Sequence, residues 1–566
     1  MKKIIIPILS LACALFVFCA CAGRTTPPGP PIDTPEETTT EKEQTTTPDV
    51  TTQTPETTEP TETTQAPETS APPPPEYDFD RGTGKVEIEE ISIISSATGK
   101  PYEGSRFETD EEGEISFYYP LLVSDADVAE AKLVVEHDGR KTEFSLDLTS
   151  RNLIDLTDPA LERATFLLIA KRDRQALAVM QIYTDEGKPI ESKTDYVHAT
   201  LIIDGVEYGT KIRGRGNSSW TEFPKKSYRL KLDSGAELFG LPKNKDFNLT
   251  SNYPDKSLMR NSVAHTVAAM FDGLDFTSVH IPVDLYLNGE YLGIYTFSDK
   301  IEEGKGRLDL AAREDEEKNS FGGLDIGFLL EMGWDYDSEN VYNRDYFDTD
   351  LLYRIYVKDP EIKVANSPEI TYISAYMRAA ERAIVSDDGW EELIDLDSFV
   401  DWFIVTEFTF NTESAFYRSC YLWKRAGGKL MLGPVWDFDM AFGNHLGDIK
   451  DYDGWCTTES TYEYISENWM NHLIEYDAFK SAVRARWEEK KEDLLDAALS
   501  AVNTYAALLD GSQKQNFLRW DIMDKRVGEA SVSPYLYKTY ESQVEYLRGF
   551  ILNRYAYMDE RIGREF

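Results

Sequence analysis

Two aspartates flank a phenylalanine in the stretch GPVWDFDMAFGN, residues 433–444. In an extended strand alternate side chains share one face, so Asp437 and Asp439 would point the same way. Two carboxylates on one face repel each other unless a cation lies between them, and Mg²⁺ or Mn²⁺ suits oxygen ligands of this kind. The alternative is a pair of turn or capping aspartates, because Asp is common in turns. Asp437 and Asp439 are therefore a candidate metal-binding pair.

A further carboxylate comes from the segment that precedes this stretch. Asn411 and Glu413 follow LDSFVDWFIVTEFTF, a run with helical periodicity. A hairpin through Gly427-Gly428 should then return the chain, so that Glu413 and Asp437 meet at one end of the same element. A carboxylate placed there could accept a hydroxyl proton, which is what phosphoryl transfer requires beside a metal site.

Basic side chains gather in KIRGRGNSSWTEFPKKSYRLKL, although the chain is otherwise acidic. Gly214 and Gly216 would let the backbone approach an anion closely, and cations on the strands would neutralise phosphate oxygens. A solvated basic hairpin is the competing interpretation. The cations singled out in this stretch are Arg213, Arg215, Lys225, Lys226 and Lys231.

Arg260 lies on the first turn of a helix that we expect to begin near Ser257, after the turn Asn252-Tyr253-Pro254-Asp255. The helix dipole disfavours a cation at that end unless an anion is near. A bound phosphate would supply the anion, and so would a salt bridge to Asp255 or another carboxylate. Both interpretations stay open.

The elements that must position these residues fall into an α+β layout. KVEIEEISII, EISFYYPLLV and a hairpin at Asp138-Gly139 predict a small antiparallel, sandwich-like β domain over residues 83–160. Residues 165–566 are rich in strands first and in helices later, with Asn288-Gly289 as another tight hairpin and Asp397 or Ser398 as the expected cap of one helix. The candidate residues lie on both sides of the expected cleft between these halves.

Composition limits the partners and the location of the chain. It has 59 Lys and Arg against 101 Asp and Glu, a formal net charge of −42, which argues against nucleic acid as a partner. Residues 1–20 have the charged, apolar and small-residue order of a signal peptide, so we expect export. Cys21 would carry a lipid that holds the chain on the outer face of a bacterial membrane, with simple cleavage and secretion as the alternative. Residues 21–82 predict an extended Thr/Pro-rich stalk.

Two cysteines, Cys420 and Cys456, remain for the folded part once the signal segment is set aside. Two cysteines make neither a zinc cluster nor a disulfide framework. They would pair in an oxidising compartment or stay as small buried residues, and we favour burial.

Four ordered motifs resemble one known family. RGRGNSSW with PKKSYRLKL, SNYPDKSLMRN, VDLYLNGEYLGIYTFSDKI and GPVWDFDMAFGN are similar to the CotH kinase family, the spore-coat protein H type of atypical protein kinase, from about residue 175 to about 560. The resemblance implies a divergent two-lobed kinase-like fold that binds ATP with Mg²⁺ or Mn²⁺ and phosphorylates Ser or Thr of secreted or coat proteins. It also implies metal binding by Asp437 and Asp439 and a catalytic base in Asn411-Thr412-Glu413, where the family usually has Asp in place of Glu413.

Three functions of different classes follow from these patterns. The first is an exported Ser/Thr protein kinase with nucleotide contacts from Arg213, Arg215, Lys226, Lys231 and Arg260. The second is a surface scaffold or adhesion protein that keeps the fold with weak or no catalysis. The third is a secreted polysaccharide hydrolase that uses paired carboxylates. The oligomeric state is not indicated by any of these patterns.

Overall fold

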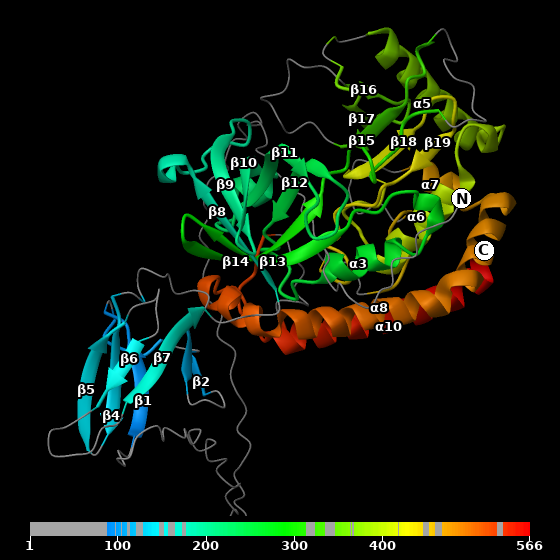
Figure 1. Cartoon of the computed structure of the whole chain (residues 1–566). Coiled ribbons are helices and arrows are strands. Elements are labelled where there is room, and N and C mark those ends of the chain that lie inside the picture. The colour runs from blue at the N-terminus through cyan, green and yellow to red at the C-terminus, as the bar shows by residue number, and fades with distance from the viewer. Residues whose placement is uncertain are drawn as a thin grey trace, which may run out of the picture.

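The computed structural model describes residues 88–566 with gaps, the longest of which are 120–127, 157–164, 313–322, 334–345 and 459–466. Cys21, the expected signal peptide and the Thr/Pro-rich stalk lie outside the described residues. Strands and helices both form large parts of the chain, which confirms the α+β class (Figure 1). No helix within the described ranges is both long and apolar enough to cross a membrane.

The first described part consists of two sheets, in the orders β1-β4-β5 and β2-β3-β7-β6. One cluster of buried residues contains Leu133 of β4 together with Phe117 of β3, so both sheets share it. The prediction of an antiparallel domain is wrong for one pair, because β3 and β7 pair in parallel. The crossover that a parallel pair needs leaves no mark in the local alternation of residues. The strands are β1 Ile88–Ile94, β2 Arg106–Thr109, β3 Ile115–Tyr119, β4 Lys132–His137, β5 Arg140–Ser145, β6 Asn152–Asp155 and β7 Thr165–Arg172.

A closed seven-stranded barrel follows, in the order β10-β11-β12-β14-β13-β8-β9. Asn288-Gly289 forms the predicted tight turn between β13 and β14, with both residues at positive φ. A parallel pair between β8 and β13 closes the barrel, and its interior holds buried side chains such as Leu230 and Phe247. The strands are β8 Ala178–Thr184, β9 Val197–Ile203, β10 Val206–Arg215, β11 Ser227–Ala236, β12 Asn244–Thr250, β13 His280–Leu287 and β14 Glu290–Asp299.

The remainder combines a five-stranded sheet, in the order β16-β17-β15-β18-β19, with helices. Its strands are β15 Phe328–Met332, β16 Tyr346–Asp348, β17 Arg354–Asp359, β18 Cys420–Lys424 and β19 Leu430–Leu432. The helices are α2 Ser218–Thr221, α3 Arg260–Ala268, α5 Pro368–Ser386, α6 Leu396–Thr409, α7 Trp469–Leu473, α8 Asp477–Arg519 and α10 Tyr540–Glu565.

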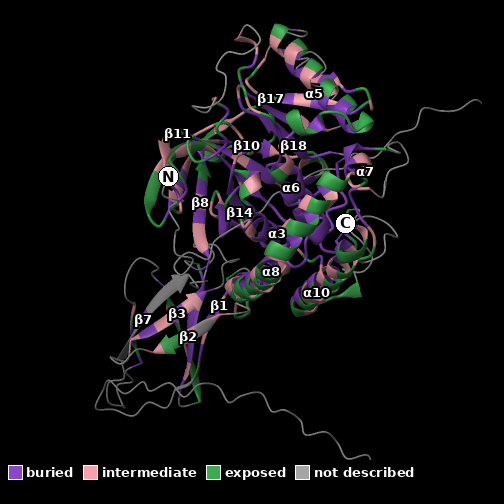
Figure 2. Cartoon of the chain, turned by 90° about the vertical axis from the view of Figure 1, so that its right-hand side faces the viewer, coloured by how far each residue is buried: buried purple, intermediate pink, exposed green. Residues whose placement is uncertain are grey.

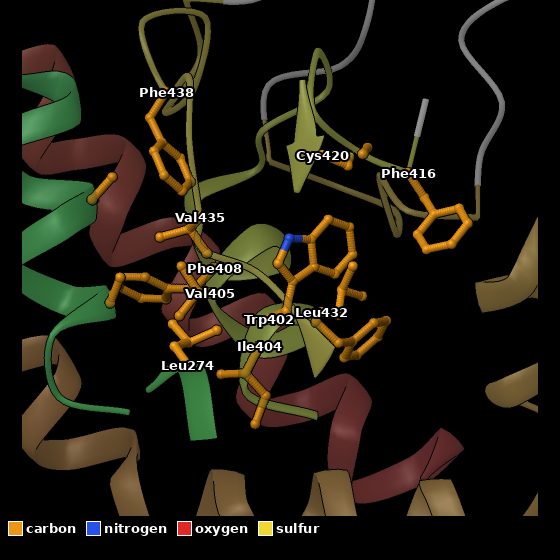
Figure 3. Packing of buried hydrophobic residues seen from close by; sticks show 14 of the residues in the cluster. Leu274, Trp402, Ile404, Val405, Phe408, Phe416, Cys420, Leu432, Val435 and Phe438 are labelled. Carbon is orange, nitrogen blue, oxygen red and sulfur yellow. The ribbon is translucent and has the colours of Figure 1, made fainter. Parts of the chain in front are cut away.

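Helix α6 lies at the centre of the largest core. All twelve residues from Ser398 to Thr409 are buried, because apolar residues lie on all sides of the helix. The sequence predicted Asp397 or Ser398 as the N-cap of this helix, and that prediction is wrong. The N-cap is Asp395, whose carboxylate accepts a hydrogen bond from the backbone N–H of Ser398 at 2.9 Å. Figure 3 shows side chains of α6 packed with Phe438 of the GPVWDFDMAFGN stretch.

The long helices α8 and α10 pack against each other along the outside of this core. Helix α8 also contacts α3, α6 and strand β14. The outward sides of α8 and α10 are exposed, whereas α3, α6 and β14, which α8 contacts, are mostly buried (Figure 2).

Candidate active site

The first part of the site is the loop that follows α6. Phe410 ends the helix in the left-handed conformation, with φ 49°, and turns the chain toward the next segment. Asn411 Nδ2 donates to the backbone carbonyl of Asp437 at 2.9 Å, and Ser414 Oγ donates to the same carbonyl at 3.4 Å. The residues that donate these two hydrogen bonds precede and follow Glu413 in the sequence. The β18–β19 hairpin therefore returns the chain as the sequence predicted, and Glu413 and Asp437 meet at one end of it.

The second part is the loop after β19, and it is not a strand. Asp437 has φ 71°, a left-handed conformation that a strand does not contain, so the argument from alternation is wrong here. Hydrogen bonds fix the loop instead. Asn261 Oδ1 accepts from the N–H of Phe438 at 2.5 Å, and Asn444 Nδ2 donates to the carbonyl of Asp439 at 2.8 Å. Such strained conformations persist where the surrounding structure holds them, as around functional sites.

Carboxylates gather between these two loops. Asp437, Asp439 and Glu413 are at most 2% exposed, and Asp255 is 1% exposed. Burial raises the pKa of Asp439 well above its usual range, and the negative charges of Asp437, Glu413 and Asp255 raise it further. Asp439 Oδ1 and Asn411 Oδ1 are buried and make no hydrogen bond. The region is rich in negative charge and in oxygen atoms that lack a donor.

This donor set fits a hard divalent cation. In the part of the chain that the structure describes, no three His, Cys, Asp or Glu side chains are arranged to hold a metal ion by themselves. Mg²⁺ is commonly bound through one or two carboxylates, with water and substrate phosphates in the other places. Asp437 and Asp439, with Asn411 beside them, match that smaller set.

An arginine faces each of the two outer carboxylates. Arg418 Nη2 lies 3.0 Å from Glu413 Oε1, and Arg260 Nη1 lies 2.6 Å from Asp255 Oδ1. The salt bridge that the sequence offered as one interpretation of Arg260 is therefore present. Nε and Nη2 of Arg260 are buried without a hydrogen-bond partner, so this guanidinium keeps donors for an anion. A phosphate contact by Arg260 stays a prediction.

A pocket of about 350 Å³ opens between the barrel and the five-stranded sheet. Arg215 lies over the ring of Trp436 at 5.1 Å, and Tyr421 packs edge-on against the same ring at 5.9 Å. Because Trp436 directly precedes Asp437, the pocket and the carboxylates share one loop. The lining residues are Arg215, Gly216, Asn217, Arg229, Asn248, Lys300, Ile301, Glu302, Glu331, Lys358, Tyr421 and Trp436.

The other cations predicted to contact nucleotide, Arg213, Lys226 and Lys231, do not line this pocket, whereas Arg229 of the same stretch does. Arg213 lies over the ring of Tyr196 at 5.1 Å, and Lys226 Nζ donates to the carbonyl of Trp220 at 2.5 Å. Burial lowers the pKa of Lys226. The side chain of Lys231 is 52% exposed on the outer face of the barrel.

Two residues of the same stretch have structural roles instead. Lys225 Nζ donates to the carbonyl of Ile294 at 2.6 Å and to Asn516 Oδ1 at 2.8 Å, so it joins the barrel to α8. Burial lowers the pKa of Lys225 well below its usual range. A Cβ on Gly214 would meet the ring of Trp220 at 2.5 Å, so this glycine makes room for an indole rather than for an anion.

Sequence reasoning missed several residues of the site. Lys300, directly after β14, and Lys358 of β17 line the pocket, far from the basic hairpin in the chain. Arg418 comes from a loop without periodicity, which offers no signal for its partner. Trp436 was also missed, although the sequence could have indicated it. It lies in the GPVWDFDMAFGN motif, and an aromatic residue next to candidate metal ligands is a candidate for nucleotide contact.

The expected burial of the two cysteines is confirmed. Cys420 and Cys456 are both buried and do not form a disulfide with each other. Cys420 begins β18, and its Sγ donates to the carbonyl of Ser414 at 2.8 Å, beside the Glu413 loop.

Comparison with known proteins identifies a family. A family model described as CotH kinase protein matches residues 212–558, a span that includes nearly all of the basic hairpin, both site loops and most of α10. No curated protein matches the chain. Since the match covers more than half of the sequence and contains every candidate catalytic, nucleotide-binding and metal-binding residue, the chain belongs to the CotH kinase protein family.

Proposed function

We propose that this protein is an ATP-dependent Ser/Thr protein kinase of the CotH type. The observation that carries the proposal is the buried pair Asp437 and Asp439, near Glu413, in a loop whose Trp436 lines a cationic and aromatic pocket. Oxygen donors, a carboxylate and nearby cations are the parts that phosphoryl transfer uses. Membership of the family supports the kinase-like chemistry.

The barrel and the helical part with its five-stranded sheet are, in this proposal, the two lobes of a divergent kinase-like domain. The pocket supports this division, because Arg229 and Asn248 line it from the barrel and Glu331 and Tyr421 line it from the sheet. We also assign the two sheets of residues 88–172 to a separate sandwich-like domain that precedes the kinase-like domain.

Each residue has a distinct role in the proposed reaction. Trp436 and Tyr421 offer aromatic faces for the base, while Arg215 and Lys300 neutralise phosphate oxygens. The candidate metal ligands are Asp437 and Asp439, and a bound Mg²⁺ or Mn²⁺ would offset charge on the β- and γ-phosphates.

The proton of the attacking hydroxyl goes to a carboxylate of this chain. Glu413 accepts the proton of a Ser or Thr hydroxyl on the protein substrate as the oxygen attacks the γ-phosphorus of ATP, whose bond to the bridging oxygen breaks and releases ADP. Arg260, with its buried Nε and Nη2, stabilises negative charge on the transferred group.

Mutations should separate binding from transfer. Asp437→Asn should abolish metal-dependent ATP binding, because it removes a charged oxygen ligand. Glu413→Gln should leave ATP binding nearly intact and lower transfer by about 10²- to 10⁴-fold, since a general base acts mainly in the transition state. Glu207→Gln, an exposed change on β10, is the matched control and should change neither. The measurements are ATP titration with Mg²⁺ or Mn²⁺ and transfer of labelled phosphate to a Ser-rich peptide.

A scaffold function is the second candidate, and Glu413 is the observation that favours it. By the resemblance to the family this residue stands where Asp is usual, and Arg418 Nη2 lies 3.0 Å from its Oε1. Glu413→Asp decides between the two functions. Higher transfer in that variant indicates an attenuated kinase, whereas ATP binding without transfer in either form supports a scaffold with weak or no catalysis.

We further propose that the protein works outside the cytoplasm. The order of residues 1–20 and the position of Cys21 support export with a lipid on that cysteine, and the stalk of residues 21–82 would hold the folded part away from the membrane. The expected substrate is therefore a secreted, coat or surface protein with accessible Ser or Thr.

A further inference from the structure

Strands β10 and β11 carry a group of cations on the outer face of the barrel. Along both strands, side chains that fill the barrel, such as Ile212 and Leu230, alternate with side chains that point outward. The outward positions nearest the pocket are all basic, and we call these residues the basic row: Lys211, Arg213, Arg215, Arg229 and Lys231.

Like charges lie directly opposite each other in the basic row. In the antiparallel register Lys211 pairs with Lys231. The next outward pair joins Arg213 to Arg229. Two like charges at directly opposite positions destabilise a sheet, so this face of the barrel gains from any anion that lies over it.

The described residues supply little negative charge to the basic row. Asp246 Oδ1 lies 2.8 Å from Arg229 Nη2, and its Oδ2 lies 3.8 Å from Lys231 Nζ, so one carboxylate serves two cations. Arg213 Nη1 donates to backbone carbonyls instead, one of them that of Gly214 at 3.1 Å. Within the described ranges neither Lys211 nor Arg213 forms a salt bridge. This surface therefore stays positive in a chain whose net charge is −42.

The spacing of the basic row fits an extended peptide better than a compact anion. Side chains two residues apart on a strand lie about 6.7 Å from each other, so the row extends over about 13 Å from Lys211 to Arg215. An extended peptide has the same spacing, and acidic residues at every second position would meet successive cations. Both strands already pair with a neighbour on each side, so such a peptide would bind through side chains and not as an added strand.

The basic row ends at the pocket that the proposed function assigns to the nucleotide. Arg215 and Arg229 line that pocket, and Arg215 lies 5.1 Å from the ring of Trp436, the residue before Asp437. We propose that the basic row binds an acidic, extended segment of the protein substrate, with Asp or Glu at alternate positions near the Ser or Thr that is phosphorylated. The inference rests on the proposed kinase function and adds a class of substrate to it.

The test compares two peptides as substrates of the full chain with ATP and Mg²⁺. Each has one central Ser, flanked on both sides at every second position by Glu in one peptide and by Gln in the other. We expect the wild type to have the lower KM for the Glu peptide. Lys211→Glu should raise that KM roughly three- to tenfold, because an attraction becomes a repulsion, whereas the KM for ATP should stay within about twofold.

The variant and its control are chosen so that folding does not confuse the result. Since Lys211 lies opposite Lys231, the introduced carboxylate would face a cation, and Lys211→Glu should fold. Lys538→Glu, an exposed change directly before α10, is the matched control and should leave the KM for the Glu peptide unchanged. The difference in KM between the two peptides should also shrink as the salt concentration rises, because salt screens exposed charges.

The outcomes separate this inference from the proposed function. Transfer by the wild type with equal KM for the two peptides overturns the role of the basic row and leaves the kinase function standing. The same KM for the Glu peptide in Lys211→Glu and the wild type also overturns it. If deletion of residues 33–76, an acidic segment, lowers that KM, the row is occupied by this chain's own segment, and the assignment to a substrate is overturned.

A binding measurement covers the case in which the kinase function fails. ATP binding without transfer to either peptide overturns the kinase function alone. Fluorescence anisotropy of a labelled Glu peptide then reports on the basic row without catalysis. Weaker binding of that peptide by Lys211→Glu than by the wild type supports the recognition of an acidic segment, and equal binding overturns it.

Discussion

The buried pair of Glu407 and Arg554 should stabilise the loop that carries Asn411 and Glu413. Both side chains are fully buried, and Arg554 Nη2 lies 2.8 Å from Glu407 Oε2. Arg554 Nε also donates to the carbonyl of Glu407 at 2.7 Å, and its guanidinium lies over the ring of Phe410 at 4.6 Å. Phe410 is the residue that directs the chain from α6 into Asn411 and Glu413.

The informative change is Arg554→Met, which keeps much of the apolar stem and removes the charge. Glu407 would then be a buried anion without this cation, although it still accepts hydrogen bonds from the N–H groups of Cys456 and Thr457 at 2.9 and 2.8 Å. Removing one partner of a buried pair costs about 3 to 5 kcal/mol, or roughly two to three and a half orders of magnitude in the folding equilibrium. Glu407→Gln combined with Arg554→Met leaves no buried charge and should cost less than Arg554→Met alone.

Amide hydrogen exchange of the full chain measures this loss where it arises. We expect faster exchange in Arg554→Met at residues 452–457, because Arg554 Nη1 donates to the carbonyls of Tyr452 and Gly454, each at 2.7 Å. The last turn of α6 should exchange faster as well, and phosphate transfer should fall more than ATP affinity. Wild-type exchange in both segments of Arg554→Met, or a double variant that is less stable than Arg554→Met, would refute the reasoning.

Three more predictions concern the charges of the site and the N-terminal segment. The raised pKa of Asp439 means that the folded chain keeps a proton that the unfolded chain releases, so stability without metal should fall as pH rises above the usual Asp range. Thermal unfolding of Asp439→Asn should lack this fall, and Mn²⁺ should stabilise only the wild type; an identical pH dependence would contradict the charge assignment. Arg215→Ala should lower ATP affinity about tenfold or more in a titration, whereas Lys231→Ala on the exposed face should lower it less. Intact-mass analysis should find a lipid on Cys21, and an unmodified terminus at another residue would remove the anchor.

The local patterns of the sequence predicted the pieces of the fold better than their assembly. The turns at Asn288-Gly289 and Gly427-Gly428 and the apolar helix before Asn411 are present because each depends on neighbouring residues. Closure of the barrel depends on the parallel pair between β8 and β13, which are about a hundred residues apart, and no local pattern encodes such a pair.

The site shows the same division between local and distant information. Asp437 and Glu413 were found by residue type and spacing, and the structure brings them together through Asn411. The conformation of Asp437 was predicted wrongly because a strand was assumed where hydrogen bonds from other segments hold a turn. Arg418 and Lys358 could not be predicted as site residues from the sequence. The role of a cation in a loop or on a strand depends on its neighbours in space, and these neighbours are known only from the fold.

Helix α8 has a consequence for how the proposed cleft can move. With 43 residues it is roughly 64 Å long, and it contacts the barrel through β14 and the helical core through α6. Both walls of the cleft are therefore packed against the same helix. Hinge rotation of one wall would have to break the hydrogen bond from Lys225 Nζ to Asn516 Oδ1, which is 2.8 Å long. We therefore expect a cleft of nearly constant width, in which small side-chain movements admit the nucleotide. Spin labels on the two walls should report the same separation with and without ATP. A large closure would contradict the restraint of both walls by α8.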